Sequence, residues 1–287
     1  MLDKPVGVGL QIERYCCWLC LYLVFCQSRP LSKFCILINI CFLIEGTHWT
    51  NEILSMLLTG KAEYTSDSKM GGMMEALPDL HMLERLRSPR ILNTHLPYKW
   101  FPRSLVNNGG KIIHTLRNPK DAYLSYFYHT SSGLELGRNT KGMSWSQFFD
   151  TCVIGKNITM GTWFDYTKEI YEAKRNNKNI HTDPEEEIKE LAKFLNVDFS
   201  DSFIKEIAFK CEFQNLKKAE IVKEFPPELM EMAAQRMKSD PGFQIPTIYR
   251  KGIVGDWKNH FTEEQNKQFD ALFKEEMRGT DIDVIFS

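Results

Sequence analysis

The spacing of apolar residues predicts helices and strands in alternation from residue 46 onward. Apolar residues in Thr50–Gly60 recur at helical intervals, and the closing glycine is typical of a helix end. Short β-prone runs lie at Pro89–Pro97 and Lys111–Leu116. Pro119 follows the second run and fits the first turn of another helix.

Two further helices carry recognisable start signals. In Thr182–Val197, Asp183 is a predicted cap and a proline follows it, while Thr262 and Gln265 of Phe261–Met277 fit a capping box. Strands that alternate with helices predict an α/β fold, with a mostly parallel central sheet and helices on both faces. Ligands of such sheets bind at the carboxyl ends of strands, which makes Gly46–Trp49, His95 and Arg117 candidate site positions.

The first 45 residues follow a different pattern. Their apolar runs, Tyr15–Cys26 and Cys35–Ile44, are shorter than the about 20 residues that a membrane-spanning helix needs. Acidic residues near the start argue against a signal peptide. This segment is therefore interpreted as buried or poorly ordered, or as sequence with which the fold did not evolve. A membrane-associated protein is a further, less favoured, hypothesis.

Composition excludes several classes of protein. The 287 residues are 43% apolar and carry a formal net charge of −1, which is ordinary for a globular protein and gives no field that attracts nucleic acid. Six of the eight cysteines precede residue 42, whereas a disulfide scaffold would spread them through the fold. Cys17 and Cys20 have zinc-like spacing but no histidine nearby, so no metal site is predicted. A reduced, cytoplasmic protein is the favoured interpretation.

Two motifs carry candidate anion chemistry. In "RKGIVGDWKNHFT", Arg250 and Lys251 precede Gly252, so two cations and a close-approaching backbone could bind a phosphate. In "LRNPKDAYLS", Arg117 ends a strand and Ser125 lies on the next helix, near enough to share one anion. From charge alone, a solvated basic turn and a structural ion pair remain alternatives.

Four motifs together resemble the cytosolic sulfotransferases. "RKGIVGDWKNHFT" is similar to their RKGxxGDWKxxFT signature, and "LRNPKDAYLSYFYH" to their RNPKDxxxSxxxF segment. "GTHWTNEIL" resembles the end of their YPKSGTxW loop, and "ILNTHLP" their catalytic-histidine strand. The resemblance implies a P-loop-like nucleotide-binding fold. It divides the chain into an atypical apolar, cysteine-rich segment at 1–45 and a sulfotransferase domain at 46–287.

The resemblance also implies a reaction and a set of site residues. Its family transfers a sulfuryl group from 3′-phosphoadenosine 5′-phosphosulfate, PAPS, to a hydroxyl or amine of a small acceptor, without a metal. Carried over by position, His95 is the general base, and its near-neutral pKa suits that role. The implied nucleotide contacts are Gly46, Thr47 and His48 at the phosphosulfate, Trp49, Cys211, Phe213 and Leu216 at the adenine, and Arg117, Ser125, Arg250, Lys251 and Gly252 at the 3′-phosphate. The acceptor itself cannot be identified from the loops.

The loop before Gly46 departs from the family pattern. Phe42, Leu43, Ile44 and Glu45 stand where the family has Tyr-Pro-Lys-Ser. The lysine that would contact the leaving oxygen is therefore Ile44, and Glu45 adds a negative charge where an anion should bind. We expect a poor catalyst, or alternatively a non-catalytic relative that binds nucleotide. Residues 1–45 are interpreted as foreign sequence joined to the domain, with a diverged but functional N-terminus as the alternative.

Two later departures concern a strand and the dimer motif. At Ile180–Thr182 the chain runs directly into the next helix, so the family's strand and its adenine-side tyrosine are predicted to be missing. Glu263 and Lys267 replace the valine and glutamate of the family's dimer motif. A homodimer is therefore possible, but not by an intact motif.

Overall fold

The computed structural model describes residues 36–42, 46–65, 72–76, 86, 88–101, 106, 109–131, 140, 142–158, 160–183, 188–219, 231, 234–235, 237–239, 249–282, 284 and 286. Within them, four parallel strands form one sheet in the order β2-β1-β3-β4. The strands are β1 (Ile36–Cys41), β2 (Arg90–Thr94), β3 (Lys111–Thr115) and β4 (Ile180–Asp183). The predicted strands at Pro89–Pro97 and Lys111–Leu116 are confirmed as β2 and β3.

The helices follow the strands in sequence. They are α2 (Thr47–Thr59), α5 (Pro119–Ser131), α6 (Trp145–Phe148), α7 (Trp163–Asn176), α8 (Ile188–Leu195), α9 (Asp201–Lys210), α10 (Phe213–Lys218) and α12 (Glu263–Glu276). Shorter turns are η2 (Met74–Ala76), η3 (Tyr98–Trp100), η5 (Asp256–Asn259) and the π-helical η4 (Phe149–Ile154). No helix in the described part of the chain is long and apolar enough to cross a membrane.

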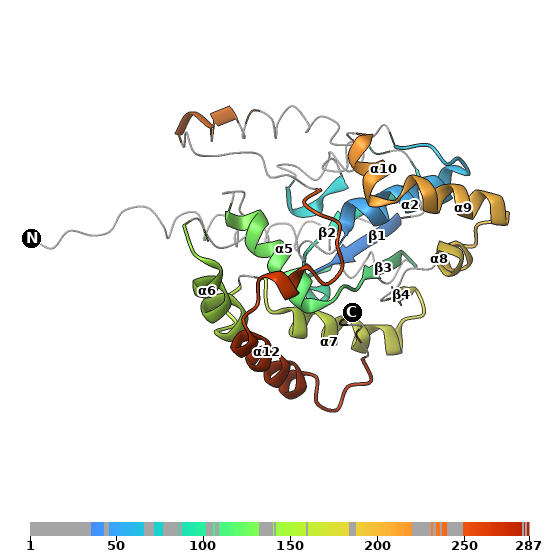
Figure 1. Ribbon diagram of the computed structural model, residues 1–287. Coiled ribbons are helices and arrows are strands. Elements are labelled where there is room, and N and C mark those ends of the chain that lie inside the picture. The colour runs from blue at the N-terminus through green and yellow to red at the C-terminus, as the bar shows by residue number, and fades with distance from the viewer. Residues whose placement is uncertain are drawn as a thin grey trace, which may run out of the picture.

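Successive side chains along the strands point to opposite faces of the sheet and pack in two separate hydrophobic cores. Leu37 and Ile113 pack with residues of α2, α8 and α9, whereas Ile38, Ile40 and Ile112 pack with residues of α5, α7 and α12. Figure 1 shows α2 and α9 on one side of the sheet and α7 and α12 on the other. The predicted α/β class, with a mostly parallel sheet covered on both faces, is therefore confirmed.

β1 is an interior strand although it precedes residue 46. Ile40 pairs with Thr94 of β2 and with His114 of β3. The apolar run predicted as buried is buried where it is described, because Leu37 to Phe42 are all at most 1% exposed. Although the predicted segment boundary lies at residue 45, Ile36–Cys41 belongs to the same sheet as the later strands. The separate origin of residues 1–45 stays a prediction.

The strand that was predicted to be missing near residue 181 is present, so that prediction was wrong. β4 pairs in parallel with β3, from Ile112 with Ile180 to Thr115 with Asp183. An edge strand needs only one partner, and Ile180 and Thr182 are β-branched residues that become buried there. Asp183 is the last residue of β4, and α8 is described from Ile188 onward. The absent adenine-side tyrosine stays a prediction.

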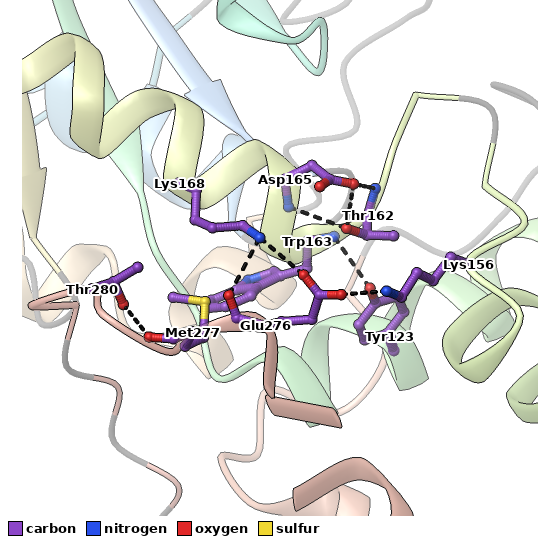
Figure 2. A network of polar contacts seen from close by, with 9 residues as sticks. All are labelled: Tyr123, Lys156, Thr162, Trp163, Asp165, Lys168, Glu276, Met277 and Thr280. Atoms are coloured by element: carbon purple, nitrogen blue, oxygen red, sulfur yellow. Dashed lines mark hydrogen bonds and ion pairs between the residues drawn. The ribbon is translucent and has the colours of Figure 1, made fainter. Parts of the chain in front are cut away.

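The carboxyl end of α12 is tied to α7 and to the turn before it. The Glu276 carboxylate accepts hydrogen bonds from Lys168, at 2.9 Å, and from Lys156 (Figure 2). At the other end of α12, Thr262 and Gln265 form the predicted capping box, with the Gln265 N–H donating to the threonine hydroxyl at 3.1 Å. These contacts hold the C-terminal helix against the core on the α7 side of the sheet.

Candidate active site

His95 lies directly after β2, at the carboxyl edge of the sheet, where α2 begins. Its Nε2 atom is 3.4 Å from the hydroxyl oxygen of Thr47, the first residue of α2. That hydroxyl is also 2.7 Å from the thiol sulfur of Cys41, the last residue of β1. The ends of two neighbouring parallel strands therefore converge on the first turn of one helix, as the topology requires.

Glu75 is the second ionisable group of this cluster. Its Oε1 atom lies 2.7 Å from His95 Nδ1 and accepts the backbone N–H of the same residue at 2.8 Å. Its Oε2 atom accepts the Thr94 hydroxyl at 2.9 Å. Both side chains of the ion pair are almost fully buried, at 4% exposed for the glutamate and 8% for the histidine.

Burial and pairing act in opposite directions on these two groups. Burial alone would lower the pKa of His95, but hydrogen bonding and charge from Cys41 and Glu75 outweigh it and raise the pKa from 6.5 to about 10. Burial would raise the pKa of Glu75, but the charge and hydrogen bonds of His95 lower it. The pair therefore favours a carboxylate and an imidazolium.

A hydrogen-bonded chain of three asparagines fixes the start of α2 against β2, the strand that precedes His95. Asn39 donates to the backbone carbonyl of Thr47 at 3.0 Å and to the side-chain oxygen of Asn93 at 2.9 Å. Asn93 donates in turn to Asn51 at 2.9 Å. All three amides are at most 5% exposed, so loss of one of these hydrogen bonds would leave a buried polar group unpaired, at a high cost in free energy.

Gly46 allows the chain to enter α2 from the sheet. Its φ of +115° lies in a region that favours glycine, and a β-carbon there would touch only Thr115 Cγ2, at 3.7 Å. The N–H groups of a first helical turn have no acceptors within the helix, so they point outward and favour an anion. The role of Gly46, Thr47 and His48 in binding a phosphosulfate stays a prediction.

Two of the predicted adenine residues, Trp49 and Cys211, are in contact near the start of α2. The Trp49 indole N–H donates to the backbone carbonyl of Cys211 at 2.9 Å, which joins α2 to the end of α9. Phe213 begins α10, where Leu216 is 1% exposed. A β-carbon on Gly252 would meet the Phe213 ring at 2.1 Å. The structure thus brings the predicted adenine residues together with the predicted phosphate turn.

The basic turn is organised by two aspartates. Asp256, only 1% exposed, pairs with Arg250 at 2.8 Å and with Lys251 at 3.0 Å. Burial would raise the pKa of Asp256, but hydrogen bonds from Lys251 and Arg250 lower it. Asp121 of α5 accepts the backbone N–H groups of Gly255 and Trp257, at 2.7 and 2.9 Å. Both cations are therefore paired within the loop, although the Lys251 side chain remains 43% exposed, and their role at a phosphate stays a prediction.

α5 presents Ser125 toward that loop. Asp121, Ser125 and Tyr128 recur at intervals of four and three residues, so they share one face of the helix. Both flanking residues contact the loop, because the Arg250 guanidinium lies 4.7 Å from the centre of the Tyr128 ring. Arg117 lies in the turn between β3 and α5, at the start of the same helix.

Comparison with known proteins identifies the family. Residues 45–281 match a family model described as the sulfotransferase domain. The chain belongs to the sulfotransferase family. Mouse sulfotransferase 1B1 is 30% identical over 258 residues, covering 83% of this chain and 81% of the relative. Rabbit amine sulfotransferase is 30% identical over 261 residues, covering 84% of this chain and 80% of the relative.

Solved structures of other proteins share the fold. Mouse sulfotransferase SULT7A1, solved in complex with PAP, superposes with a TM-score of 0.65 at 26% identity and covers 90% of both chains. Retinol dehydratase, solved with androsterone and the inactive cofactor PAP, gives a TM-score of 0.71 at 20% identity, covering 92% of this chain and 87% of its own. The P-loop-like fold predicted for this sulfotransferase is thereby confirmed.

The sequence predicts only part of this site. His95 and Thr47 are predicted and lie in contact, whereas Glu75 is not predicted. The available signal was a single carboxylate inside the apolar run "GGMMEALP". The substituted loop residues Ile44 and Glu45 lie outside the described residues. Among the described residues, no group of three or more histidine, cysteine or acidic side chains could hold a metal.

Proposed function

We propose that this sulfotransferase moves a sulfuryl group from PAPS to the hydroxyl or amine of a small-molecule acceptor in the cytoplasm. The observation that carries the proposal is the position of His95, with Nε2 3.4 Å from the Thr47 hydroxyl in the first turn of α2. A base therefore lies beside the backbone N–H groups that favour a phosphosulfate. Membership of the sulfotransferase family supports the same reaction class.

The proposed reaction leaves one proton for the protein to remove. The acceptor oxygen or nitrogen forms a bond to sulfur, while the bond from sulfur to the 5′-phosphate oxygen breaks. His95 Nε2 takes the acceptor's proton, and the products are the sulfated acceptor and adenosine 3′,5′-bisphosphate. Negative charge develops on the leaving phosphate oxygen, where the N–H groups at the start of α2 and the Thr47 hydroxyl can stabilise it.

The chemistry of the basic turn fits the 3′-phosphate of this donor. Arg250 and Lys251 supply a bidentate fork and a point charge, and the turn that carries them is held by Asp121 and Asp256. Ser125 and Arg117 complete the proposed phosphate site from α5 and the turn before it. Asp256 neutralises part of the positive charge, so the phosphate competes with a carboxylate for both cations.

The proposed adenine site lies between α2 and α10. Trp49 and Phe213 supply the aromatic surfaces, and Cys211 and Leu216 lie beside them. The complex of mouse sulfotransferase SULT7A1 with PAP, the desulfated donor, supports a nucleotide of this type. Packing of Phe213 against Gly252 links the proposed adenine site to the phosphate turn in this sulfotransferase.

A second candidate function is nucleotide binding without efficient turnover. The sequence favours it at one point, since Ile44 and Glu45 stand where the family pattern has lysine and serine. The loss of a cation at the leaving oxygen affects transfer more than binding, because the 3′-phosphate and adenine contacts are made elsewhere. Turnover of PAPS in the presence of acceptor distinguishes the two functions.

Calorimetry with adenosine 3′,5′-bisphosphate tests the proposed nucleotide site. We expect the wild-type chain to bind, and Arg250→Ala to weaken binding by about 1.5–3 kcal/mol, the range for a hydrogen bond to a charged group. Arg175→Ala is the matched control, because Arg175 pairs with Glu172 and Asp281 on the exposed surface of α7. Equal affinity of wild type and Arg250→Ala would remove the phosphate assignment.

A further inference from the structure

We propose that Glu75 is a positioning residue that fixes the His95 ring, with Nδ1 toward its carboxylate and Nε2 toward Thr47. The proposal deepens the proposed function, because it concerns the base of that reaction. It does not depend on a particular acceptor.

The segment that carries Glu75 runs beside β2. Met73 forms a parallel bridge with Asn93, an offset of twenty residues that also places Glu75 beside His95. Gly72 permits this approach, because a β-carbon there would come within 2.7 Å of the Ile91 carbonyl oxygen. The glutamate therefore reaches the histidine through a defined register between two backbone segments.

Among the described residues, the Glu75 carboxylate contacts the end of β2, His95 and its own backbone N–H. Oε1 contacts both the backbone N–H and the ring Nδ1 of His95, and Oε2 accepts the Thr94 hydroxyl. Because Oε1 is held by the backbone N–H, it meets the ring nitrogen at an angle rather than along the N–H bond. The carboxylate thus positions the ring and its backbone together.

This arrangement selects the tautomer that a base needs. A neutral imidazole carries one proton, and the negative charge of a carboxylate oxygen 2.7 Å from Nδ1 favours that proton on Nδ1. Nε2 then keeps its lone pair on the side of Thr47, where the proposed acceptor must bind. With the opposite tautomer, Nε2 would carry the proton and could not accept one from the acceptor.

Among the described residues, two other titratable groups interact with His95. Cys41, at the end of β1, hydrogen-bonds with the imidazole and raises its pKa together with Glu75. His129 of α5 interacts with it by charge; burial first, and the His95 charge second, lower the pKa of His129 to about 4. His129 is therefore neutral at physiological pH. Of the two groups that raise the pKa of His95, Cys41 and Glu75, only Glu75 is a carboxylate.

Nitrogen-15 NMR of labelled histidine tests the positioning role without an activity assay. The spectra of wild type, Glu75→Gln and Glu75→Ala give the tautomer and the pKa of His95, which is assigned from its loss in His95→Ala. We expect a proton on Nδ1 in the wild-type neutral form. We expect Glu75→Gln to lower the pKa of His95 by at least about one unit. In Glu75→Ala we expect a substantial population of the opposite tautomer.

The matched control is Glu276→Gln, which removes a carboxylate paired with Lys156 and Lys168 instead of a histidine. It should leave the His95 titration unchanged, while circular dichroism confirms that each variant is folded. An unchanged pKa and tautomer of His95 in folded Glu75→Gln would overturn the proposal. If Glu75→Ala fails to fold, the Glu75→Gln titration alone decides.

Steady-state kinetics gives a second, independent test of the role of Glu75. In PAPS-dependent assays, Glu75→Ala should lower kcat by about 10- to 100-fold, by analogy with carboxylates that orient metal-bound histidines. Glu75→Gln should move the acid limb of kcat/KM to lower pH, which a purely structural residue would not do. If the wild type neither binds bisphosphate nor turns over PAPS, the proposed function fails while the NMR result still decides the role of Glu75.

Discussion

Gly252 lies against the face of Phe213, so that a β-carbon at residue 252 would come within 2.1 Å of the ring. The glycine precedes the loop that Asp121 holds, and the phenylalanine begins α10. This contact joins the proposed phosphate turn to the proposed adenine site. Movement of either residue should therefore change the contacts at both the adenine and the 3′-phosphate of a bound nucleotide.

Gly252→Ala should weaken the binding of adenosine 3′,5′-bisphosphate by at least about tenfold. The substitution adds a collision with Phe213 to the cost of about 1–2 kcal/mol for a β-carbon at positive φ. Gly60→Ala is the control, because it has a similar φ, +67° against +64°, and nothing within 4 Å. Calorimetry on the three proteins separates collision from backbone strain. Equal affinities for both variants would show that the contact with Phe213 does not matter for binding.

Asp256→Asn should destabilise the fold by about 1–3 kcal/mol at neutral pH, because it removes the charge that pairs with Arg250 and Lys251. The folded pKa of Asp256 lies below its usual 3.8. Its stabilisation is therefore present above about pH 4 and is lost as the pH falls through the folded pKa. Urea unfolding of both proteins across this range should show their difference shrinking in acid. A difference independent of pH would contradict the assignment.

His95→Ala should abolish measurable sulfuryl transfer and change bisphosphate affinity by no more than a few-fold. The base acts on the acceptor, whereas the proposed nucleotide contacts lie on α2, α5, α10 and the basic turn. Single-turnover assays and calorimetry on the same preparation provide the two measurements. A variant that keeps most of its activity would return His95 to a structural role.

The pH dependence of the wild type should be displaced to the alkaline side. His95 must be neutral to accept a proton, and its pKa is raised from 6.5 to about 10. kcat/KM should therefore rise as the pH increases above 6.5, while the stability contributed by the imidazolium, complete below pH 6.5, is lost toward pH 10. Rates and thermal midpoints from pH 6 to pH 10 check both. An acid limb at or below 6.5 would contradict the raised pKa.

Restoring Tyr-Pro-Lys-Ser at residues 42–45 should raise the transfer rate by about 10²–10³, the usual effect of one donor at a developing oxyanion. Ile44→Lys alone should help less, since Glu45 remains. Phe42 already supplies a buried ring, packed on Tyr123 at 5.7 Å and Tyr166 at 5.9 Å, so the four-residue change tests mainly the following loop. PAPS turnover with phenols, alcohols and amines compares the three chains. Robust turnover by the unrepaired chain would show that another cation replaces the lysine.

Local signals predicted the parts of the site that depend on local structure. Thr262 and Gln265 cap a helix three residues apart, and His95 follows a short β-prone run that becomes β2. Glu75 gave no comparable signal, because its role depends on a backbone bridge between Met73 and Asn93 that no local pattern encodes. The pairing of both cations with Asp256 likewise requires the folded turn.

The error at β4 has a different physical cause. The family pattern led to the expectation of a missing strand, yet Ile180 and Thr182 are sufficient to pair with the exposed edge of β3. Pairing along an open sheet edge is a property of the neighbouring strand as much as of the sequence that joins it. A short segment with two β-branched residues can therefore complete a sheet without resembling the family's strand.

The interior position of β1 has a consequence for synthesis of the chain. Ile40 leaves the ribosome long before its partners Thr94 and His114, so a strand with apolar side chains on both faces stays unpaired while its neighbours are made. Non-local parallel pairing is slow, and unpaired apolar strands aggregate. We expect the yield of folded protein to depend on chaperones that cover this strand during translation, and to respond to the codons between residues 42 and 115.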